Sequence, residues 1–164
     1  KRKIGIREVS HNPSCNVIYR KKDFLEIGGF DEGLWPCEDV DLDYRLKKKK
    51  LHFRYNSHAV VYHYRPQSLK SLSRMMYRYG MMQGILTKRY GFFRRIQLIP
   101  IAFMLFLLLV FVNPAWLFFL LLFYRFLIIK SKSFIEGNIV VWLCMVSAFV
   151  WMSGFFRGIA ILQR

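Results

Sequence analysis

The sequence predicts an α/β unit over residues 1–66 that is followed by helices of a membrane protein. Up to about Gly91 the chain is polar and rich in lysine and arginine, whereas no charged residue occurs from Ile96 to Tyr124. The polar part alternates helix-like and strand-like patterns, which is typical of an α/β domain. The apolar runs approach the ~20 residues that a membrane helix needs. A length of 164 residues would suit one domain, but this change of composition indicates several parts.

The first predicted elements lie before residue 30. Asn12-Pro13-Ser14 predicts a turn, and Asn16–Tyr19 predicts a strand. A short helix is expected over Lys21–Ile27, and Gly28-Gly29 would end it as a C-cap.

A second helix is expected over Glu38–Lys49. Its first turn is acidic and its last turn is basic, as the helix dipole prefers. The stretch Phe53–Tyr62 is rich in β-forming residues and predicts a strand near Ala59–Tyr62.

Residues 67–95 are expected to form one or two basic amphipathic helices. Apolar side chains recur with helical spacing from Leu69 to Tyr79, whereas Lys70, Arg74 and Arg78 lie on another face. Such a helix can lie in the headgroup layer of a membrane or be an ordinary amphipathic core helix. Its position before an apolar run favours the interfacial reading.

Three membrane spans are predicted over about 96–112, 115–130 and 138–161. Asn113-Pro114 separates the first two, because Asn-Pro favours a turn and proline removes a helical donor, so we predict a hairpin with this turn at the far side. Three spans would place Lys130 and Lys132 on the side of residues 1–66, in agreement with the positive-inside rule. Arg157 would then fall near the far side, which leaves open a re-entrant last span or a polar cavity around this residue.

The net charge of +16 is compatible with nucleic-acid binding. However, no recognition helix or zinc spacing follows Lys47–Lys50, and other basic residues such as Lys88, Arg89 and Arg94 flank the apolar spans. Basic flanks match anionic lipid headgroups, so the sequence favours a membrane as partner and no nucleic acid. Salt-dependent binding to DNA would support the weaker reading.

The three cysteines, Cys15, Cys37 and Cys144, are too scattered for a disulfide framework or a zinc module. They fit a soluble part that faces a reducing cytosol. Lys1 to Ser10 lacks the apolar stretch of a signal peptide. Because the first residue is Lys1 and not methionine, we expect the C-terminal part of a longer protein, in which a site shared with upstream residues would be incomplete here.

Four of the ten acidic residues lie within positions 38–43. A carboxylate at a helix N-terminus, such as Asp39, could act as a general base, or Glu38 and Asp39 could simply stabilise the start of the helix. We interpret two i,i+4 pairs as structural, namely Asp41 with Arg45 and Asp43 with Lys47.

His63 follows the second predicted strand and is a candidate ligand for a metal or a phosphate, although a lone histidine is more often simply exposed or satisfied. Arg65, Arg74 and Arg78 could bind a diphosphate or a lipid phosphate, and contact with headgroups explains them equally well. His11, His52 and His58 are weaker candidates for such a role.

Four segments carry a resemblance to a known family: Asn16–Arg20, Phe24–Glu32, Glu38–Leu42 and Arg45-Leu46. Their order and spacing resemble the acceptor half of family 2 glycosyltransferases, over about residues 12–66. The runs Tyr62–Pro66 and Tyr77–Gly80, with the apolar spans behind them, are similar to membrane-anchored members that build exopolysaccharides of the succinoglycan type.

The resemblance implies a GT-A fold that binds a nucleotide-sugar and a divalent cation, Mg or Mn. Asp39 would be the catalytic base, with Glu38 beside it, and His63 would contact the metal or the diphosphate. The D-x-D motif that mainly binds the metal would lie upstream of Lys1, and the Q-x-x-R-W signature of processive synthases is absent. Asp43 and Tyr44 stand where members vary. The implied substrate-binding residues are Asn16, Arg20, Gly29, Asp31 and Arg65.

The expected protein is therefore an inverting glycosyltransferase in cell-surface polysaccharide or glycoconjugate synthesis. Its acceptor would be lipid-linked or a glycan, and it would be a multi-pass protein of the inner (plasma) membrane with the catalytic part in the cytoplasm. The alternative is a non-catalytic membrane scaffold of a polysaccharide assembly complex.

Overall fold

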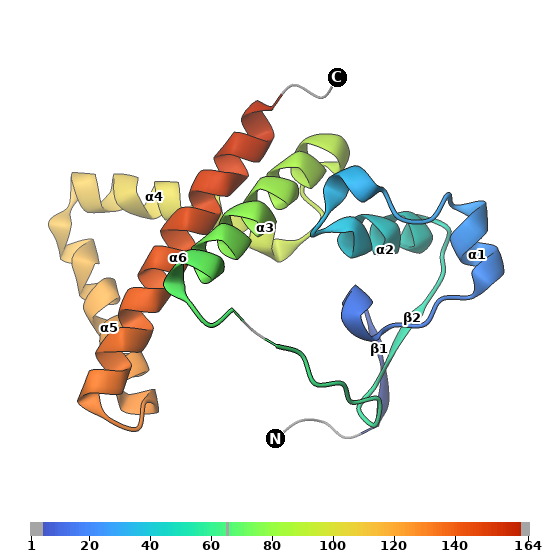
Figure 1. Cartoon of the computed structure of the whole chain (residues 1–164). Helices are drawn as coiled ribbons and strands as arrows, with labels where there is room; N and C mark the ends of the chain where they lie inside the picture. Colours follow the sequence, from blue (N-terminus) through green and yellow to red (C-terminus); the bar gives the residue numbers. More distant parts are fainter. Residues whose placement is uncertain (1–4, 65, 162–164) are drawn as a thin grey trace. The chain divides into compact units, whose positions relative to one another are not determined.

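The computed structural model describes residues 5–64 and 66–161, which divide into two compact units, Lys1–Pro66 and Gln67–Arg164 (Figure 1). We call these the N-terminal unit and the C-terminal unit. The N-terminal unit contains β1 (Ile6–Val9), η1 (Ser14–Asn16), α1 (Lys21–Glu26), η2 (Glu32–Leu34), α2 (Glu38–Lys48) and β2 (Phe53–Asn56). The C-terminal unit contains α3 (Leu69–Tyr90), η3 (Arg95–Leu98), α4 (Ile99–Val112), η4 (Pro114–Trp116), α5 (Leu117–Lys130) and α6 (Phe134–Ala160).

The core of the N-terminal unit is built by α2 against β2. Leu42 and Leu46 lie one turn apart on α2 and are buried against Phe53, and Val9 of β1 packs on this cluster. Strands β1 and β2 pair antiparallel, with Val9 opposite Phe53. The predicted helices over 21–27 and 38–49 are confirmed, each ending within a residue of its expected limit.

The turn after α1 depends on two glycines. Gly28 and Gly29 have φ angles of 84° and 68°, a region that side chains other than glycine rarely adopt. The Gly29 N–H donates to the Phe24 carbonyl at 2.9 Å and closes the turn. A Cβ at Gly29 would also meet the Phe24 ring at 3.2 Å.

Two predicted strands are wrong, because neither Asn16–Tyr19 nor Ala59–Tyr62 forms a backbone ladder. In the described residues the sheet has two strands, β1 and β2, so the second strand lies six residues earlier than expected. The two segments meet through a side chain instead, since the Asn16 amide donates to the Ala59 carbonyl at 2.9 Å. A two-stranded sheet does not define a GT-A fold, which therefore stays a prediction.

Helix α3 packs along α6 through glycines on both helices (Figure 1). Gly80 and Gly84 of α3 are spaced as in a G-x-x-x-G motif, and so are Gly154 and Gly158 of α6. A Cβ at any of the four would strike a backbone carbonyl of the opposite helix. Small residues at this spacing let two helix backbones approach closely.

The two helices run in the same direction. Gly80 faces the Trp151 carbonyl and Gly84 faces the Phe155 carbonyl, so residue numbers increase in the same direction along both helices. Lys88 Nζ donates to the Ile161 carbonyl at 2.8 Å, which ties the C-terminal ends of α3 and α6 together. The expected basic face of α3 is exposed at Lys70, Arg74 and Arg78, and its placement in a headgroup layer stays a prediction.

The three-span prediction is not confirmed, because two helical segments of the described chain are long and apolar enough to cross a membrane, Arg95–Val112 and Phe134–Ala160. Both segments leave most of their residues exposed. Helix α5 has 14 residues, about 21 Å at 1.5 Å per residue, and carries exposed Arg125. A bilayer core is about 30 Å thick.

The predicted hairpin is also wrong. The chain does break at Asn113-Pro114, where Asn113 Oδ1 accepts the Ala115 N–H at 3.0 Å. However, α5 packs along α6, and α4 does not lie alongside α5 (Figure 1). The break is a bend, so α4 and α5 together lead from one end of α6 to its other end.

Contacts at both ends of α6 support this path. Before α4, Gln97 Nε2 donates to Gln83 Oε1 of α3 at 3.3 Å, near the joined C-terminal ends of α3 and α6. After α5, Tyr124 donates to Asn138 Oδ1 at 3.0 Å, in the first turns of α6. Lys130 and Lys132 therefore lie at the opposite end of α6 from Lys88. Their position on the side of residues 1–66 stays a prediction.

Candidate active site

The candidate site is built on the first turn of α2, where Asp39 is held by two backbone amides. The Ser14 N–H donates to Oδ2 at 3.0 Å, and the Val40 N–H donates to Oδ1 at 2.7 Å. Asp39 is 8% exposed. A carboxylate offers about four lone-pair sites, so these two bonds leave both oxygens with further acceptor capacity.

Glu38 precedes Asp39 and has an unsatisfied oxygen. Its Oε1 lies 3.5 Å from the Ser14 hydroxyl, which is at the limit of a hydrogen bond. Its Oε2 is buried and has no hydrogen-bond partner within the described part of the chain. A buried polar atom without a partner is costly, so this oxygen is suited to accept a hydrogen bond from a ligand.

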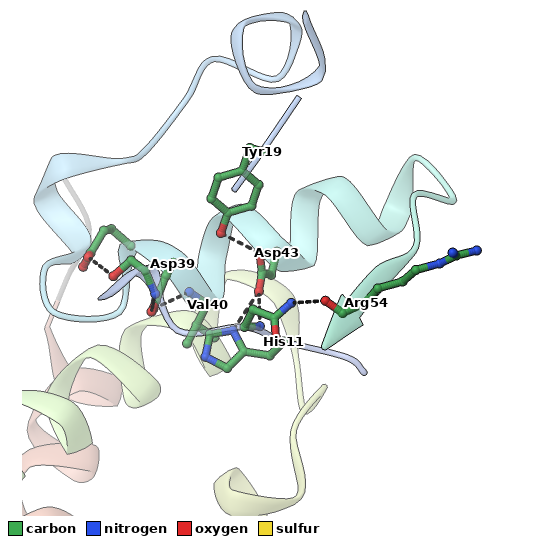
Figure 2. Close-up of polar contacts among 9 residues, drawn as sticks. His11, Tyr19, Asp39, Val40, Asp43 and Arg54 are labelled. Atoms are coloured by element: carbon green, nitrogen blue, oxygen red, sulfur yellow. Dashed lines mark hydrogen bonds and ion pairs between the residues drawn. The ribbon is translucent and has the colours of Figure 1, made fainter. Parts of the chain in front are cut away.

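Asp43 lies one turn after Asp39 and is the centre of a hydrogen-bond network (Figure 2). Its Oδ2 lies 2.8 Å from His11 Nδ1 and accepts the Asn12 N–H at 3.0 Å, while Oδ1 accepts the Tyr19 hydroxyl at 3.0 Å. Burial, and then the charge of Asp43 and its hydrogen bond, raise the pKa of Tyr19. The predicted Asp43–Lys47 ion pair is therefore replaced by contacts to the segment before α1.

Asp41 points to a different partner, because residues two apart lie on different faces of a helix. Asp41 is fully buried and pairs with Arg45, as predicted, at 2.7 Å. Arg45 also donates to the carbonyls of Ile27 and Gly29, at 2.7 Å each. Gly29, a predicted substrate-binding residue, is therefore held to α2 through its backbone carbonyl.

Two of the other predicted substrate-binding residues, Asn16 and Arg20, lie at the surface of the N-terminal unit. Asn16 and Arg20 are exposed, and the Asn16 amide is engaged by Ala59. Asp31 caps the η2 turn, where its Oδ1 accepts the Gly33 N–H at 3.1 Å. Arg65 lies outside the described residues. The structure thus joins Asn16 to the site through its neighbour Ser14, and gives Asp31 a local role.

His63 is exposed, and its Nδ1 donates to the Tyr64 carbonyl at 2.7 Å, which leaves Nε2 at the surface. Within the described residues no group of three or more histidine, cysteine or acidic side chains is arranged to hold a metal ion. One imidazole does not make a metal site, so the residues described do not by themselves fit the expected divalent cation.

A surface pocket of about 610 Å³ lies at the other end of α2. Its walls include Lys47, Lys50, His52 and Glu8 together with apolar residues of β1 and β2. Because Asp39 is in the first turn of α2 and Lys47 in the last, this pocket is separate from the candidate site.

Sequence reasoning missed the segment His11–Tyr19 as the partner of α2. A signal was available, since Asp39 and Asp43 are spaced i,i+4 and must share a face of the helix. What the spacing could not reveal is that the donors are His11, Tyr19 and two backbone amides of a segment with little regular structure.

The model of the family described as "Glycosyl transferase family group 2" matches residues 9–156. This range includes α2, the segment that its carboxylates bind, and nearly all of α6. The chain therefore belongs to glycosyl transferase family group 2.

Two curated relatives are similar to part of the chain. Both are named "Pre-mycofactocin glycosyltransferase", from the CDC 1551 / Oshkosh and the ATCC 25618 / H37Rv strains of Mycobacterium tuberculosis. Each is 40% identical over 55 residues, which cover 34% of this chain and 12% of the relative. The match therefore spans about an eighth of the length of these relatives. No solved structure matches the chain.

Proposed function

We propose that this chain is part of an inverting glycosyltransferase that moves a sugar from a nucleotide-sugar to a lipid-linked or glycan acceptor. The reaction would serve cell-surface polysaccharide or glycoconjugate synthesis. Membership of the family supports sugar transfer. The observation that carries the site is the pair Glu38 and Asp39, with lone pairs left open on Asp39 and an unpartnered buried oxygen on Glu38.

Asp39 would act as the general base. In the transfer, the acceptor oxygen bonds to the anomeric carbon, the bond from that carbon to the diphosphate breaks, and the hydroxyl proton passes to Asp39. The Ser14 and Val40 amides hold the carboxylate in one orientation, so the base is positioned before the acceptor arrives. Glu38 Oε2 would accept a hydrogen bond from a second acceptor hydroxyl.

The proposal includes a divalent cation but assigns it no step of the reaction. When bound, it would offset the charge of the leaving diphosphate. Among the described residues, His63 is the predicted metal ligand, and its Nε2 lies at the surface. Further ligands would have to come from outside the described residues, because these gather no metal-binding group.

Membrane attachment is supported by the two segments long and apolar enough to span. Lys88, Arg89, Arg94 and Arg95 gather where α3 ends and α4 begins, and would lie on the opposite side of the membrane from Lys130 and Lys132. Helices α4 and α5 would cross once together, and α6 would return. The cytoplasmic position of the catalytic part stays a prediction.

The function is tested with full-length protein in membranes. A panel of nucleotide-sugars is supplied together with a membrane lipid extract as acceptor, and release of nucleoside diphosphate is measured against membranes without the protein. One donor is expected to be consumed, and NMR of the product should show inversion at the anomeric carbon. Retention at this carbon would contradict the base mechanism, and absence of turnover with every donor would favour the non-catalytic scaffold.

A further inference from the structure

Two carboxylates of α2 hold the segment His11–Tyr19. Asp43 contacts His11, the Asn12 amide and Tyr19, and Asp39 accepts the Ser14 amide. The bonds of Asp43 therefore lie on both sides of Ser14 along the chain. Figure 2 shows Asp43 between His11 and Tyr19, with Asp39 one turn away on the same helix.

The segment is also tied on its other side. Asn12 Nδ2 donates to the Arg54 carbonyl at 3.2 Å, and the Asn16 amide donates to the Ala59 carbonyl at 2.9 Å. Its C-terminal end carries Tyr19, whose ring meets those of Phe24 and Phe30 at centroid distances of 6.0 and 6.2 Å. Asp43 makes more of the hydrogen bonds between this segment and α2 than Asp39 does.

Asp43 itself is too enclosed to meet a substrate, since it is 2% exposed and already bonds three groups of the segment. Any effect of this residue on sugar transfer must therefore pass through the segment that it binds. Ser14 is the link, because its amide orients the carboxylate of Asp39 and its hydroxyl lies 3.5 Å from Glu38 Oε1.

We propose that Asp43 is a positioning residue for the transfer reaction, which holds the segment His11–Tyr19 so that Ser14 keeps Asp39 aligned toward the acceptor. The proposal rests on the proposed function. Loss of Asp43 frees three donors at once and loosens Ser14 against Asp39. A displacement of about 1 Å at a reacting group can lower a rate by about 10²-fold.

The test compares Asp43→Ala and Asp43→Asn in the full-length protein in membranes. Asp43→Ala is expected to lower kcat by about 10²-fold with the KM of the donor within about threefold, because the base is misaligned. Asp43→Asn keeps a carbonyl oxygen for the Asn12 amide, so it should recover most of this loss. Hydrogen exchange of the peptide over residues 11–19 should be faster in Asp43→Ala, while exchange over Phe53–Asn56 stays unchanged.

The two proposals fail in different ways. If the wild-type protein turns over a donor and Asp39→Asn abolishes this, but Asp43→Ala stays within twofold, the positioning role is wrong and the proposed function stands. If the wild-type protein consumes no donor, the proposed function fails and the positioning role falls with it. If Asp43→Ala unfolds, Tyr19→Phe is the second variant, and unchanged kcat with faster exchange over 11–19 would overturn the proposal.

Discussion

A single methyl group at the glycine contact between α3 and α6 should separate the two helices. In Gly84→Ala, the new Cβ would overlap the Phe155 carbonyl and lie 3.0 Å from the Ile159 nitrogen and 3.1 Å from the Gly158 Cα. Carbon contacts are favourable near 3.5–4.0 Å, and backbone atoms cannot rotate away as a side chain can. The helices must therefore move apart.

The cost can be bounded from the same contacts. A gap of about 0.5–1 Å forfeits a quarter to a half of each contact energy, and Trp151, Met152 and Phe155 form the buried cluster at this interface. Overpacking of this kind costs about 1–3 kcal/mol. Alanine gains about 1 kcal/mol over glycine in helix propensity, so any observed loss underestimates the clash.

Thermal unfolding of the full-length protein in nanodiscs measures this loss. The midpoints of Gly84→Ala and Gly158→Ala are expected to fall, whereas that of Ser153→Ala, an exposed position on α6, should not. Midpoints raised in both glycine variants, as the helix propensity of alanine alone predicts, would refute the close approach of α3 and α6.

Three further outcomes are expected. Leu42→Ala, at a fully buried position of the N-terminal core, should cost about 2–5 kcal/mol in denaturant unfolding, and a loss below 1 kcal/mol would contradict the core assignment. Because the pKa of Tyr19 is raised in the folded state, the contribution of Tyr19 to stability is complete below pH ~10 and is lost as the pH rises toward the folded-state pKa. Tyr19→Phe should therefore flatten the alkaline decline of the free energy of unfolding. An equally steep decline in both proteins would argue against this role of Tyr19. With Cys15, Cys37 and Cys144 replaced by serine, Lys132→Cys and Ile161→Cys should react with an impermeant maleimide from opposite sides of the membrane, one on intact cells and the other only after permeabilisation; labelling of both from the same side would contradict the two-crossing path.

Local signals predicted the helices of the N-terminal unit well. The charge gradient of residues 38–49 and the glycines at 28 and 29 act within a few residues, so helix α2 and the turn after α1 could be predicted from the sequence. The strands could not, because Ala59–Tyr62 has the composition of a strand but pairs with no ladder partner in the described chain. Strand formation depends on a neighbour that composition does not reveal.

The candidate site likewise combines features that local sequence predicts with contacts that it does not predict. Placing Asp39 at a helix N-terminus needed local reasoning alone, whereas its Ser14 partner lies 25 positions away. The path through the C-terminal unit likewise depended on α3 meeting α6. Gly80-x-x-x-Gly84 and Gly154-x-x-x-Gly158 were visible in the sequence, and they would have indicated a close helix pair before the number of spans was considered.

The most direct measurement is the turnover of Asp39→Asn in full-length protein in membranes, with the donor that the wild-type protein consumes. The account predicts a fall in kcat of about 10²-fold or more, because the proton acceptor is lost. Glu26→Gln is the control, since it removes one exposed carboxylate that pairs with Lys49 and should leave kcat within about twofold. Equal turnover in Asp39→Asn and the wild-type protein would contradict the role of Asp39 as base.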